Sequence, residues 1–226
     1  MKNNTKLALA ITAALAATFG ASANAVTTTS ISFDTSTPVT LTLTDWNSNL
    51  LFHKFDTSLG TLVSVTLDFS SSLQTVLTVT NSSSSASSGT AQTELQVTIQ
   101  DASNGLNAPQ MDVLSNAYSY SLDPNENVQS GTLTKTGSSH DVYSSSIILA
   151  EFSGTGNISL PVGTFTQTLL ANTGGNTAAA QTTSASATGT VTYTYIPVPE
   201  PSTALLGLCG LGMVAGFKRR SRSAQA

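Results

Sequence analysis

Hydrophobic and polar residues alternate along most of the middle of this chain. The alternation is plainest in five segments: Leu41–Thr44, Val63–Phe69, Leu77–Thr80, Leu95–Ile99 and Val191–Tyr195. A period of two with many β-branched residues is typical of half-buried strands. Apolar side chains would line the inner face of each strand. Threonine and serine would line the outer face, where their hydroxyls stay hydrated.

The same pattern predicts further strands at Val142–Phe152, Asn157–Leu160 and Thr164–Leu170. We expect eight or nine short strands, separated by turn residues, and no amphipathic helix between the two ends of the chain. The predicted fold class is therefore all-β, an antiparallel β-sandwich that is jelly-roll-like. Two low-complexity stretches, 82–88 and 171–189, are predicted to be loops.

The N-terminus has the three parts of a secretory signal peptide. Lys2 and Lys6 precede an apolar run over 7–19, and Ala23-Asn24-Ala25 offers a small-x-small cleavage site before Val26. The alternative is a membrane helix that stays in place, but the apolar run is shorter than the roughly 20 residues that a span needs. We therefore expect residues 1–25 to form a signal helix that signal peptidase removes.

The C-terminus combines a proline-rich neck, a short apolar stretch and a basic end. The neck is Val198-Pro199-Glu200-Pro201-Ser202, the apolar stretch covers 203–217, and Lys218, Arg219 and Arg220 begin a basic tail that runs to 222. Prolines keep the neck extended, as a protease substrate must be. Basic residues after the apolar stretch would stay in the cytoplasm and leave the rest of the chain outside. The pattern predicts a short transmembrane helix over 203–217 with a cleavable neck.

This tail resembles the PEP-CTERM sorting signal over residues 197–226. The resemblance implies processing by an exosortase, a membrane protease-transpeptidase of exopolysaccharide-producing Gram-negative bacteria. The protein would be anchored briefly in the inner membrane and then reach the cell surface or the medium. An ordinary single-pass tail anchor is the alternative interpretation.

Without its two ends, the chain has a very different charge. The predicted body, residues 26–196, keeps two lysines and eleven acidic residues, a net charge of −9 against −4 for the whole chain. It contains neither arginine nor cysteine. Nucleic-acid binding, which needs a basic surface, is therefore excluded. A cysteine nucleophile, a disulfide and a cysteine-based zinc site are excluded as well.

A second resemblance lies within the body. Residues 54–67 resemble the opening motif of the choice-of-anchor E domain, in which a Phe-Asp-x-x-x-Gly-Thr-Leu turn leads into an alternating strand. Here the motif is Phe55-Asp56 followed by Gly60. The resemblance implies no catalytic residues. The motif also has a structural interpretation, because aspartate caps turns and glycine adopts backbone conformations closed to other residues.

Three groups of residues are candidates for chemistry. Trp46, Phe52 and Phe55 would stack on a sugar ring if they were exposed, although core packing is the commoner role of such a cluster. The loop 123–127 gathers oxygen atoms of the kind that Ca²⁺ prefers, but without EF-hand spacing, and an Asx-type turn is the alternative. His140-Asp141 lacks a Gly-x-Ser-x-Gly nucleophile elbow, so we expect a loop histidine.

Together these features predict an exported β-sandwich that is not an enzyme and needs no cofactor. We expect a structural or adhesive component associated with an exopolysaccharide matrix or biofilm. The first alternative is a carbohydrate-binding module that uses the aromatic cluster. A glycosidase is less favoured, because no two carboxylates are paired along the sequence.

Overall fold

The computed structural model describes residues 27–103, 105–106 and 110–198. Ten strands make up most of this part: β1 (Thr29–Asp34), β2 (Val39–Leu43), β3 (Asn47–His53), β4 (Gly60–Asn81), β5 (Ser87–Ile99), β6 (Gln110–Leu114), β7 (Tyr118–Leu122), β8 (Asn127–Tyr143), β9 (Asn157–Thr173) and β10 (Thr177–Pro197). A 3₁₀ turn, η1 (Thr57–Leu59), precedes β4. The α-helix α1 (Ser146–Glu151) lies between β8 and β9.

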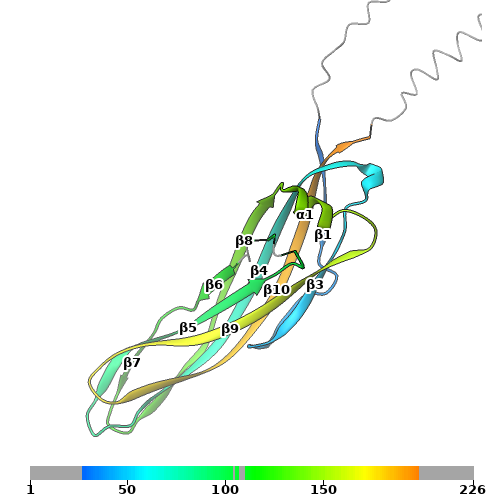
Figure 1. Cartoon of the computed structure of the whole chain (residues 1–226). Coiled ribbons are helices and arrows are strands. Elements are labelled where there is room, and N and C mark those ends of the chain that lie inside the picture. Colours follow the sequence, from blue (N-terminus) through cyan, green and yellow to red (C-terminus); the bar gives the residue numbers. More distant parts are fainter. Residues whose placement is uncertain (1–26, 104, 107–109, 199–226) are drawn as a thin grey trace, which may run out of the picture.

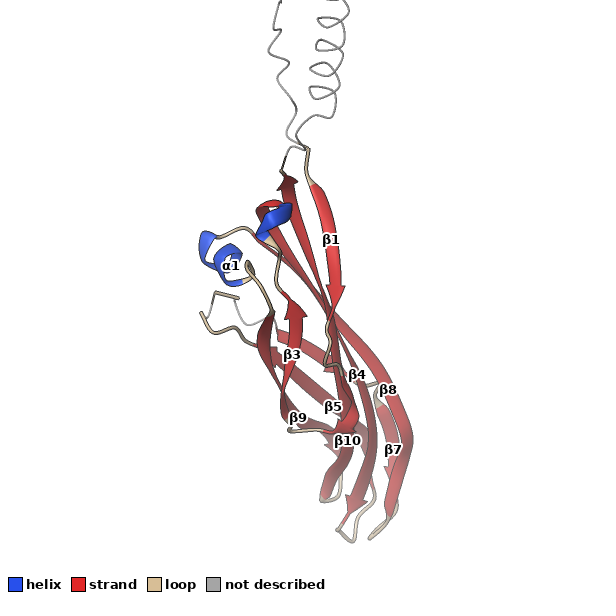
Figure 2. Ribbon diagram, turned by 90° about the vertical axis from the view of Figure 1, so that its right-hand side faces the viewer, coloured by secondary structure: helices blue, strands red, loops and turns tan. Residues whose placement is uncertain are grey.

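The strands form two antiparallel sheets, which appear as two layers in Figure 2. The β10 sheet has the order β1-β10-β4-β8, with β2 also paired to β10. The β9 sheet has the order β3-β9-β5-β6, with β7 also paired to β5. Early strands thus pair with late ones in a nested series: β1 with β10, β3 with β9, β4 with β8 and β5 with β6. This nesting is the wrapping order of a jelly roll, and the predicted antiparallel β-sandwich is confirmed.

The sandwich is elongated, and both described ends of the chain leave it at the same pole (Figure 1). Thr29, at the start of β1, pairs with Tyr195, near the end of β10. We call this end, which also carries α1 and η1, the terminal pole. The opposite end, beyond β7, is the far pole.

Three turns, at 82–86, 123–126 and 174–176, make up the far pole. The buried Asn81 joins two of them, because its Nδ2 donates to the carbonyls of Ser85 (2.7 Å) and Asp123 (3.1 Å). The predicted loop over 82–88 is confirmed over 82–86, where it forms a hydrogen-bonded turn, but β5 already begins at Ser87.

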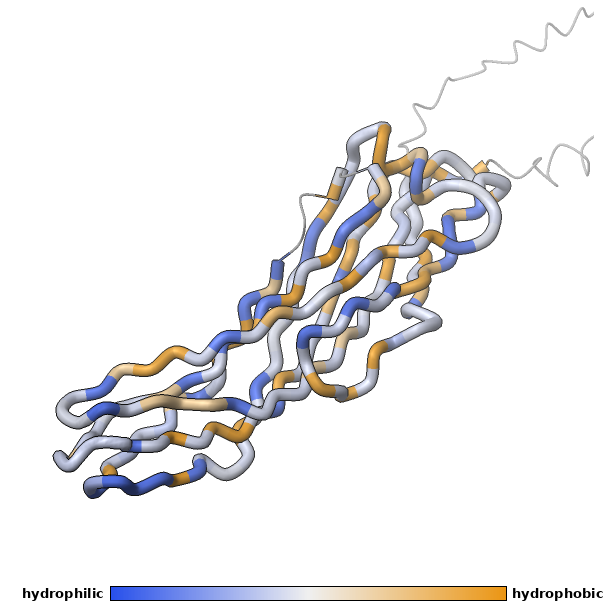
Figure 3. Tube along the Cα trace, turned by 60° about the horizontal axis from the view of Figure 1, so that its bottom comes forward, coloured by the Kyte–Doolittle hydropathy of each residue, from blue (hydrophilic) through white to orange (hydrophobic). Residues whose placement is uncertain are grey.

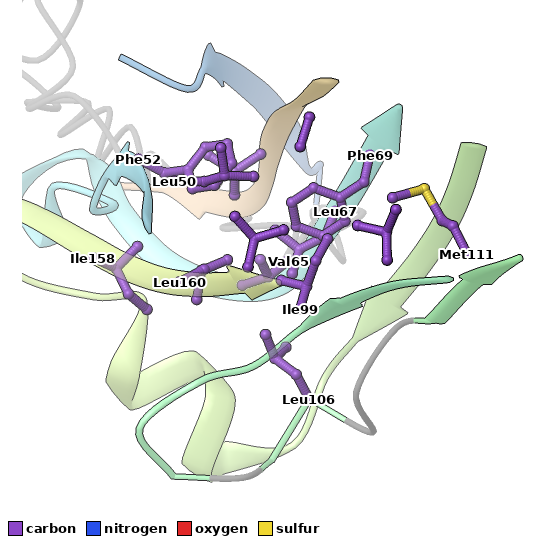
Figure 4. Close-up of a cluster of buried hydrophobic side chains, with 14 of the residues drawn as sticks. Leu50, Phe52, Val65, Leu67, Phe69, Ile99, Leu106, Met111, Ile158 and Leu160 are labelled. Carbon is purple, nitrogen blue, oxygen red and sulfur yellow. The ribbon is translucent and has the colours of Figure 1, made fainter. Parts of the chain in front are cut away.

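The main core lies between the sheets near the terminal pole. Leu50, Phe52, Leu67, Phe69 and Ile99 are among its buried side chains, several of which Figure 4 shows in contact. Hydropathy alternates along the strands (Figure 3), as the sequence pattern predicts. A smaller core near the far pole consists of Leu77, Val79, Ala91, Tyr120 and Leu122.

A buried layer of hydroxyl groups separates the two cores. Thr75 lies between Leu73 and Leu77 on β4, and its Oγ1 is 3.0 Å from that of Thr93 on β5 and 2.8 Å from that of Thr183 on β10. Hydrogen bonding makes the burial of these hydroxyls tolerable. The layer joins the two sheets through polar rather than apolar contacts.

The loop predicted over 171–189 is wrong, because β9 continues to Thr173 and β10 begins at Thr177. This segment is rich in alanine, which strands usually avoid. At Gly189 a small residue is needed, because the Phe69 ring of β4 fills the space where a side chain would lie. A Cβ at Gly189 would lie 2.5 Å from the Phe69 ring.

The strand predicted over Val142–Phe152 is also wrong. β8 ends at Tyr143, and α1 carries the chain from one sheet to the other. Ser145 caps α1 by accepting a hydrogen bond from the Ile148 N–H. Ile148 and Phe152, four residues apart, are both fully buried, so one helical face replaces the predicted alternation. Other predicted strands merge: 63–69 and 77–80 are parts of β4, and 157–160 and 164–170 are parts of β9.

Within the described ranges, no helix has the length and apolar character needed to cross a membrane. The predicted signal helix 1–25, with its cleavage site at Ala23, Ala25 and Val26, and the predicted transmembrane helix 203–217 lie outside the described residues.

Candidate functional site

The predicted sorting segment begins where the sheet ends. Pro197 is the last residue of β10 and pairs with Gly60, and the Val198 N–H donates to the Leu59 carbonyl at 3.1 Å. The remaining residues of the predicted signal lie outside the described part of the chain: Pro199, Glu200, Pro201, Ser202, Lys218, Arg219 and Arg220. Folded structure therefore continues up to the Pro-Glu-Pro neck.

The Phe55-Asp56 motif forms the surface on which this end of β10 rests. Asp56 caps η1, its Oδ1 accepting a hydrogen bond from the Ser58 N–H at 2.8 Å, and this bond lowers the pKa of Asp56. Gly60 has φ 154° and ψ −158°, a conformation nearly confined to glycine. A Cβ there would lie 2.0 Å from the Ile196 carbonyl oxygen. Gly60 thus permits the close approach of β10.

Phe55 is completely buried, with its ring 5.7 Å from that of Tyr193 and 5.0 Å from that of Tyr195. The Tyr193 hydroxyl donates to the His53 carbonyl at 2.6 Å, and burial raises the pKa of Tyr193. Phe52 is only 1% exposed and lies in the same core. Trp46 is half-buried against that core. Phe52 and Phe55 therefore offer no face to a sugar, and the core-packing alternative describes them.

His140 lies on the outer face of the β10 sheet, where β8 pairs with β4. Its Nδ1 contacts Asp68 Oδ1 at 2.5 Å, and both side chains are about half or more exposed. The neighbouring Asp141 is not the carboxylate that it contacts. An exposed pair of this kind contributes little to stability, and nothing in its geometry indicates an activated serine.

The loop 123–127 folds as a tight turn at the far pole. The Glu126 carboxylate accepts a hydrogen bond from the Asp123 N–H at 2.7 Å, and the Glu126 N–H donates to the Asp123 carbonyl at 3.2 Å. Asn125 adopts the left-handed conformation, with φ 60°. The turn is therefore closed by the Glu126 carboxylate and the Asp123 carbonyl, and not by an aspartate or asparagine side chain as in the Asx-type turn of the alternative interpretation.

A cluster that we call the acidic corner joins the loop after β5 to the end of α1 at the terminal pole. Ser103 Oγ lies 2.6 Å from Asp101 Oδ2 and 2.5 Å from Glu151 Oε2. Burial raises the pKa of Asp101, but hydrogen bonds from Ser103 and from the Gly105 and Leu106 N–H groups outweigh burial and leave the pKa lowered. Sequence reasoning missed this cluster, because Glu151 lies 48 residues after Ser103.

Groups of three or more His, Cys, Asp or Glu residues able to hold a metal ion do not occur among the described residues. Sequence reasoning also missed Phe165, whose side chain is 56% exposed on the outer face of the β9 sheet. The alternation signal was available, since Phe165 is out of phase with the buried Val162 and Leu160 of the same strand. The inward and outward positions of β9 alternate without interruption through Gly163, so Phe165 falls on the outward face.

Comparison with known proteins places the clearest similarity at the C-terminus. A family profile described as the PEP-CTERM protein-sorting motif matches residues 197–223. This motif implies an exported protein that is anchored by its C-terminus and processed by an exosortase. No curated protein matches the chain.

Among solved structures, the chain has slight similarity to two from infectious bursal disease virus. The Gx strain structure is 10% identical, with a TM-score of 0.16, over 79% of this chain and 44% of the viral chain. The T13 viral particle is 12% identical, with a TM-score of 0.15, over 77% of this chain and 41% of the viral chain. The chain thus spans less than half the length of the viral chains it matches.

Proposed function

We propose that this protein is a structural or adhesive component of an exopolysaccharide matrix, exported and then cut near Pro199–Pro201 by an exosortase. The observation that carries the proposal is the position of the sorting segment. It leaves the terminal pole directly after β10, so the elongated body would project away from the membrane with its far pole outermost (Figure 1). A cut at the neck would release or transfer the intact sandwich.

The outer surface supports a passive role. Serine and threonine side chains bond to one another across neighbouring strands, as Ser32 Oγ does to Thr192 Oγ1 at 2.8 Å. Rows of hydroxyls on an acidic, arginine-free body favour solubility and hydrogen bonding to sugars over anion capture. We propose that the body acts without catalysis. Hydrolysis of any member of a polysaccharide panel by the purified protein would contradict this.

We also propose that the body is of choice-of-anchor E type. The support is the architectural role of the resembling residues: Phe55 fills the terminal pole, Asp56 caps η1, and Gly60 admits β10. These roles explain why such a motif would precede a variable anchor, because it supports the strand from which the anchor leaves.

Intact-mass analysis of the extracellular protein tests the processing step. The mature chain should lack everything from near Pro199 onward in an exosortase-positive host, and should keep Phe217 in a host without the enzyme. Replacing Pro199, Glu200 and Pro201 together by alanine should abolish cutting, whereas Pro161→Ala on β9 should not. A mature wild-type chain that retains Phe217 would show the proposal to be wrong.

Co-sedimentation tests the matrix role. The mature protein should sediment with the exopolysaccharide of its own host at physiological salt. Recovery of all the protein from the supernatant would contradict a matrix role while leaving the processing step intact.

A second candidate function, sugar binding, is favoured by Phe165. Its exposed ring lies opposite Gln96 on β5, beside a hollow of about 290 Å³ that Asn47 and Gln100 also line. Aromatic faces stack on pyranose rings and amides bond their hydroxyls. Phe165→Ala should abolish binding on a glycan array, whereas Leu43→Ala, which trims another exposed apolar side chain, should not. Equal binding by wild type and Phe165→Ala would exclude this face.

A further inference from the structure

Exposed apolar side chains border the point where β10 ends. Leu59, Val63, Ile196 and Val198 are each 37–57% exposed. Ile196 pairs with Thr61 of β4, and the Val198 N–H donates to the Leu59 carbonyl, so all four lie within a few residues of the place where β10 leaves the sheet. We call these four side chains the apolar rim. The rim lies at the terminal pole, where the sorting segment begins (Figure 1).

A β-bulge places one member of the rim on the surface. Tyr195 pairs with Leu62 and Thr194 pairs with Ser64, so Val63 lies between the two pairs at a shift in register. Bulges change the direction in which a side chain points. Leu62 is accordingly 9% exposed, whereas Val63 beside it is 38% exposed. The exposure of Val63 therefore follows from the backbone of the strand pair.

The segments that carry the rim contain no charged residue. Residues 57–67 and 186–198 are both uncharged, in a body whose net charge is −9. A surface that enters the headgroup layer of a membrane must keep its charges in water, because burying an unpaired charge is costly. The apolar rim avoids that cost, although the body as a whole is acidic.

The neck between the rim and the apolar stretch of the sorting signal is short. Four residues, 199–202, separate Val198 from the stretch that begins at Thr203. Fully extended, this connection reaches at most about 18 Å, since each residue spans about 3.3–3.6 Å. The headgroup layer takes up roughly 5–8 Å of that reach. The terminal pole is therefore held close to the headgroups as long as the chain is uncut.

The apolar stretch itself provides no spare length. The predicted helix over 203–217 would be about 22 Å long, whereas the hydrocarbon core of a bilayer is about 30 Å thick. A span that is too short is accommodated by local thinning of the bilayer or by its flanking residues. Nothing in this mismatch would let the pole stand away from the membrane.

We propose that the apolar rim inserts into the headgroup layer of the inner membrane while the protein is still anchored. Leucine, isoleucine and valine side chains gain burial at the boundary between headgroups and acyl chains. The proposal rests on the C-terminal anchor that the sorting motif implies, and is independent of the matrix role. The contact would hold the Pro-Glu-Pro neck at a fixed depth for a membrane protease. Because membrane binding scales with the apolar area buried, four side chains would not retain the protein after the cut.

Site-specific labelling of the full chain in phospholipid vesicles tests the proposal. The body has no cysteine, so in a Cys209→Ser background Leu59→Cys or Val63→Cys carries a single environment-sensitive fluorophore. Both labels should show blue-shifted emission and quenching by spin-labelled lipid. Leu43→Cys is the matched control, because Leu43 is 64% exposed and pairs with Ser184, about 40 Å along β10 from Ile196. Rim labels that behave like the Leu43 label would overturn the proposal.

A label on the native Cys209 reports the anchor separately, because this residue lies within the apolar stretch. Quenching at Cys209 with rim labels in water would overturn the rim contact alone and leave the processing step intact. A Cys209 label in water would contradict the anchor, and with it both the processing step and the rim contact.

Variants of the rim identify the side chains responsible. Ile196→Thr combined with Val198→Thr removes apolar surface from exposed positions and keeps β-branched residues, so the variant should fold normally by circular dichroism. The label at Leu59→Cys should then lose its blue shift. Leu41→Thr combined with Leu43→Thr, exposed positions on β2, should leave that blue shift unchanged. A full blue shift in the rim variant, or its loss in the β2 variant, would contradict the assignment of the contact to the rim.

Discussion

Replacing Thr75 by valine should destabilise this fold more than replacing all three threonines of the buried hydroxyl layer. Thr75 Oγ1 is the hydrogen-bond partner of both Thr93 Oγ1, at 3.0 Å, and Thr183 Oγ1, at 2.8 Å. Valine has the same shape but no hydroxyl. The substitution therefore creates no cavity, and it leaves two buried hydroxyls without their partner.

The size of the effect follows from that count. Each stranded hydroxyl costs about 1–3 kcal/mol, so Thr75→Val should lower the free energy of unfolding by about 3 kcal/mol. For a domain of this size that corresponds to a fall in Tm of roughly 6–12 °C. The triple valine variant strands nothing and should differ from wild type by less than about 1 kcal/mol.

Urea unfolding of the mature protein, followed by circular dichroism, measures both quantities. Thr66→Val, on the same strand but on its hydrated outer face, is the matched control and should change stability by less than about 0.5 kcal/mol. If Thr75→Val matched the control, or if the triple variant were the least stable, the hydroxyl layer would not be the polar connection between the sheets that the distances indicate.

Three further predictions concern the terminal pole. Gly60→Ala forces a Cβ to within 2.0 Å of the Ile196 carbonyl oxygen. It should cost about 1–3 kcal/mol in urea unfolding, and limited proteolysis should then trim the end of β10; unchanged trimming would contradict this. Phe55→Ala removes a completely buried ring and should cost about 3–5 kcal/mol; a loss below about 1 kcal/mol would mean that the ring is not packed as described. Because the folded state raises the pKa of Tyr193 above its ordinary 10.0, stability is complete below that pH and falls as the pH rises through the folded pKa. Tyr193→Phe should flatten this alkaline decline in circular dichroism, and an unchanged decline would assign it to another group.

Alternation predicted most strands because each sheet has one face on the apolar core and one face in water. It failed wherever burial did not require large apolar groups. The segment 177–189 is strand because most of it pairs with β4, and Gly189 leaves room for the Phe69 ring. Thr75, Thr93 and Thr183 are buried because they bond one another. A sequence pattern predicts that a strand threonine lies on the outer face. Only the positions of its hydrogen-bonding partners in the folded structure show that such a threonine is buried.

The candidate sites divide in the same way. The sorting motif is contiguous, so its residues could be recognised without a fold. The acidic corner could not be recognised in this way. Ser103 lies in the loop between β5 and β6, whereas Glu151 ends α1, between β8 and β9, and the two meet only because α1 packs against that loop. Likewise, burial of Phe52 and Phe55 depended on what faced them, while Phe165 is exposed because it lies at an outward-facing position of β9.

By itself, the sequence determined the β class of the body, the acidic and cysteine-free chemistry of its surface, and the sorting signal at its end. These properties depend on composition and on residues that are close together in the chain, so they can be inferred without knowing the fold. The tertiary structure alone decided that the sorting segment leaves from a pole where Gly60 and Phe55 support β10, that hydroxyls join the two sheets, and that two distant carboxylates meet at one serine. Those contacts join residues far apart in the chain, so no local pattern records them.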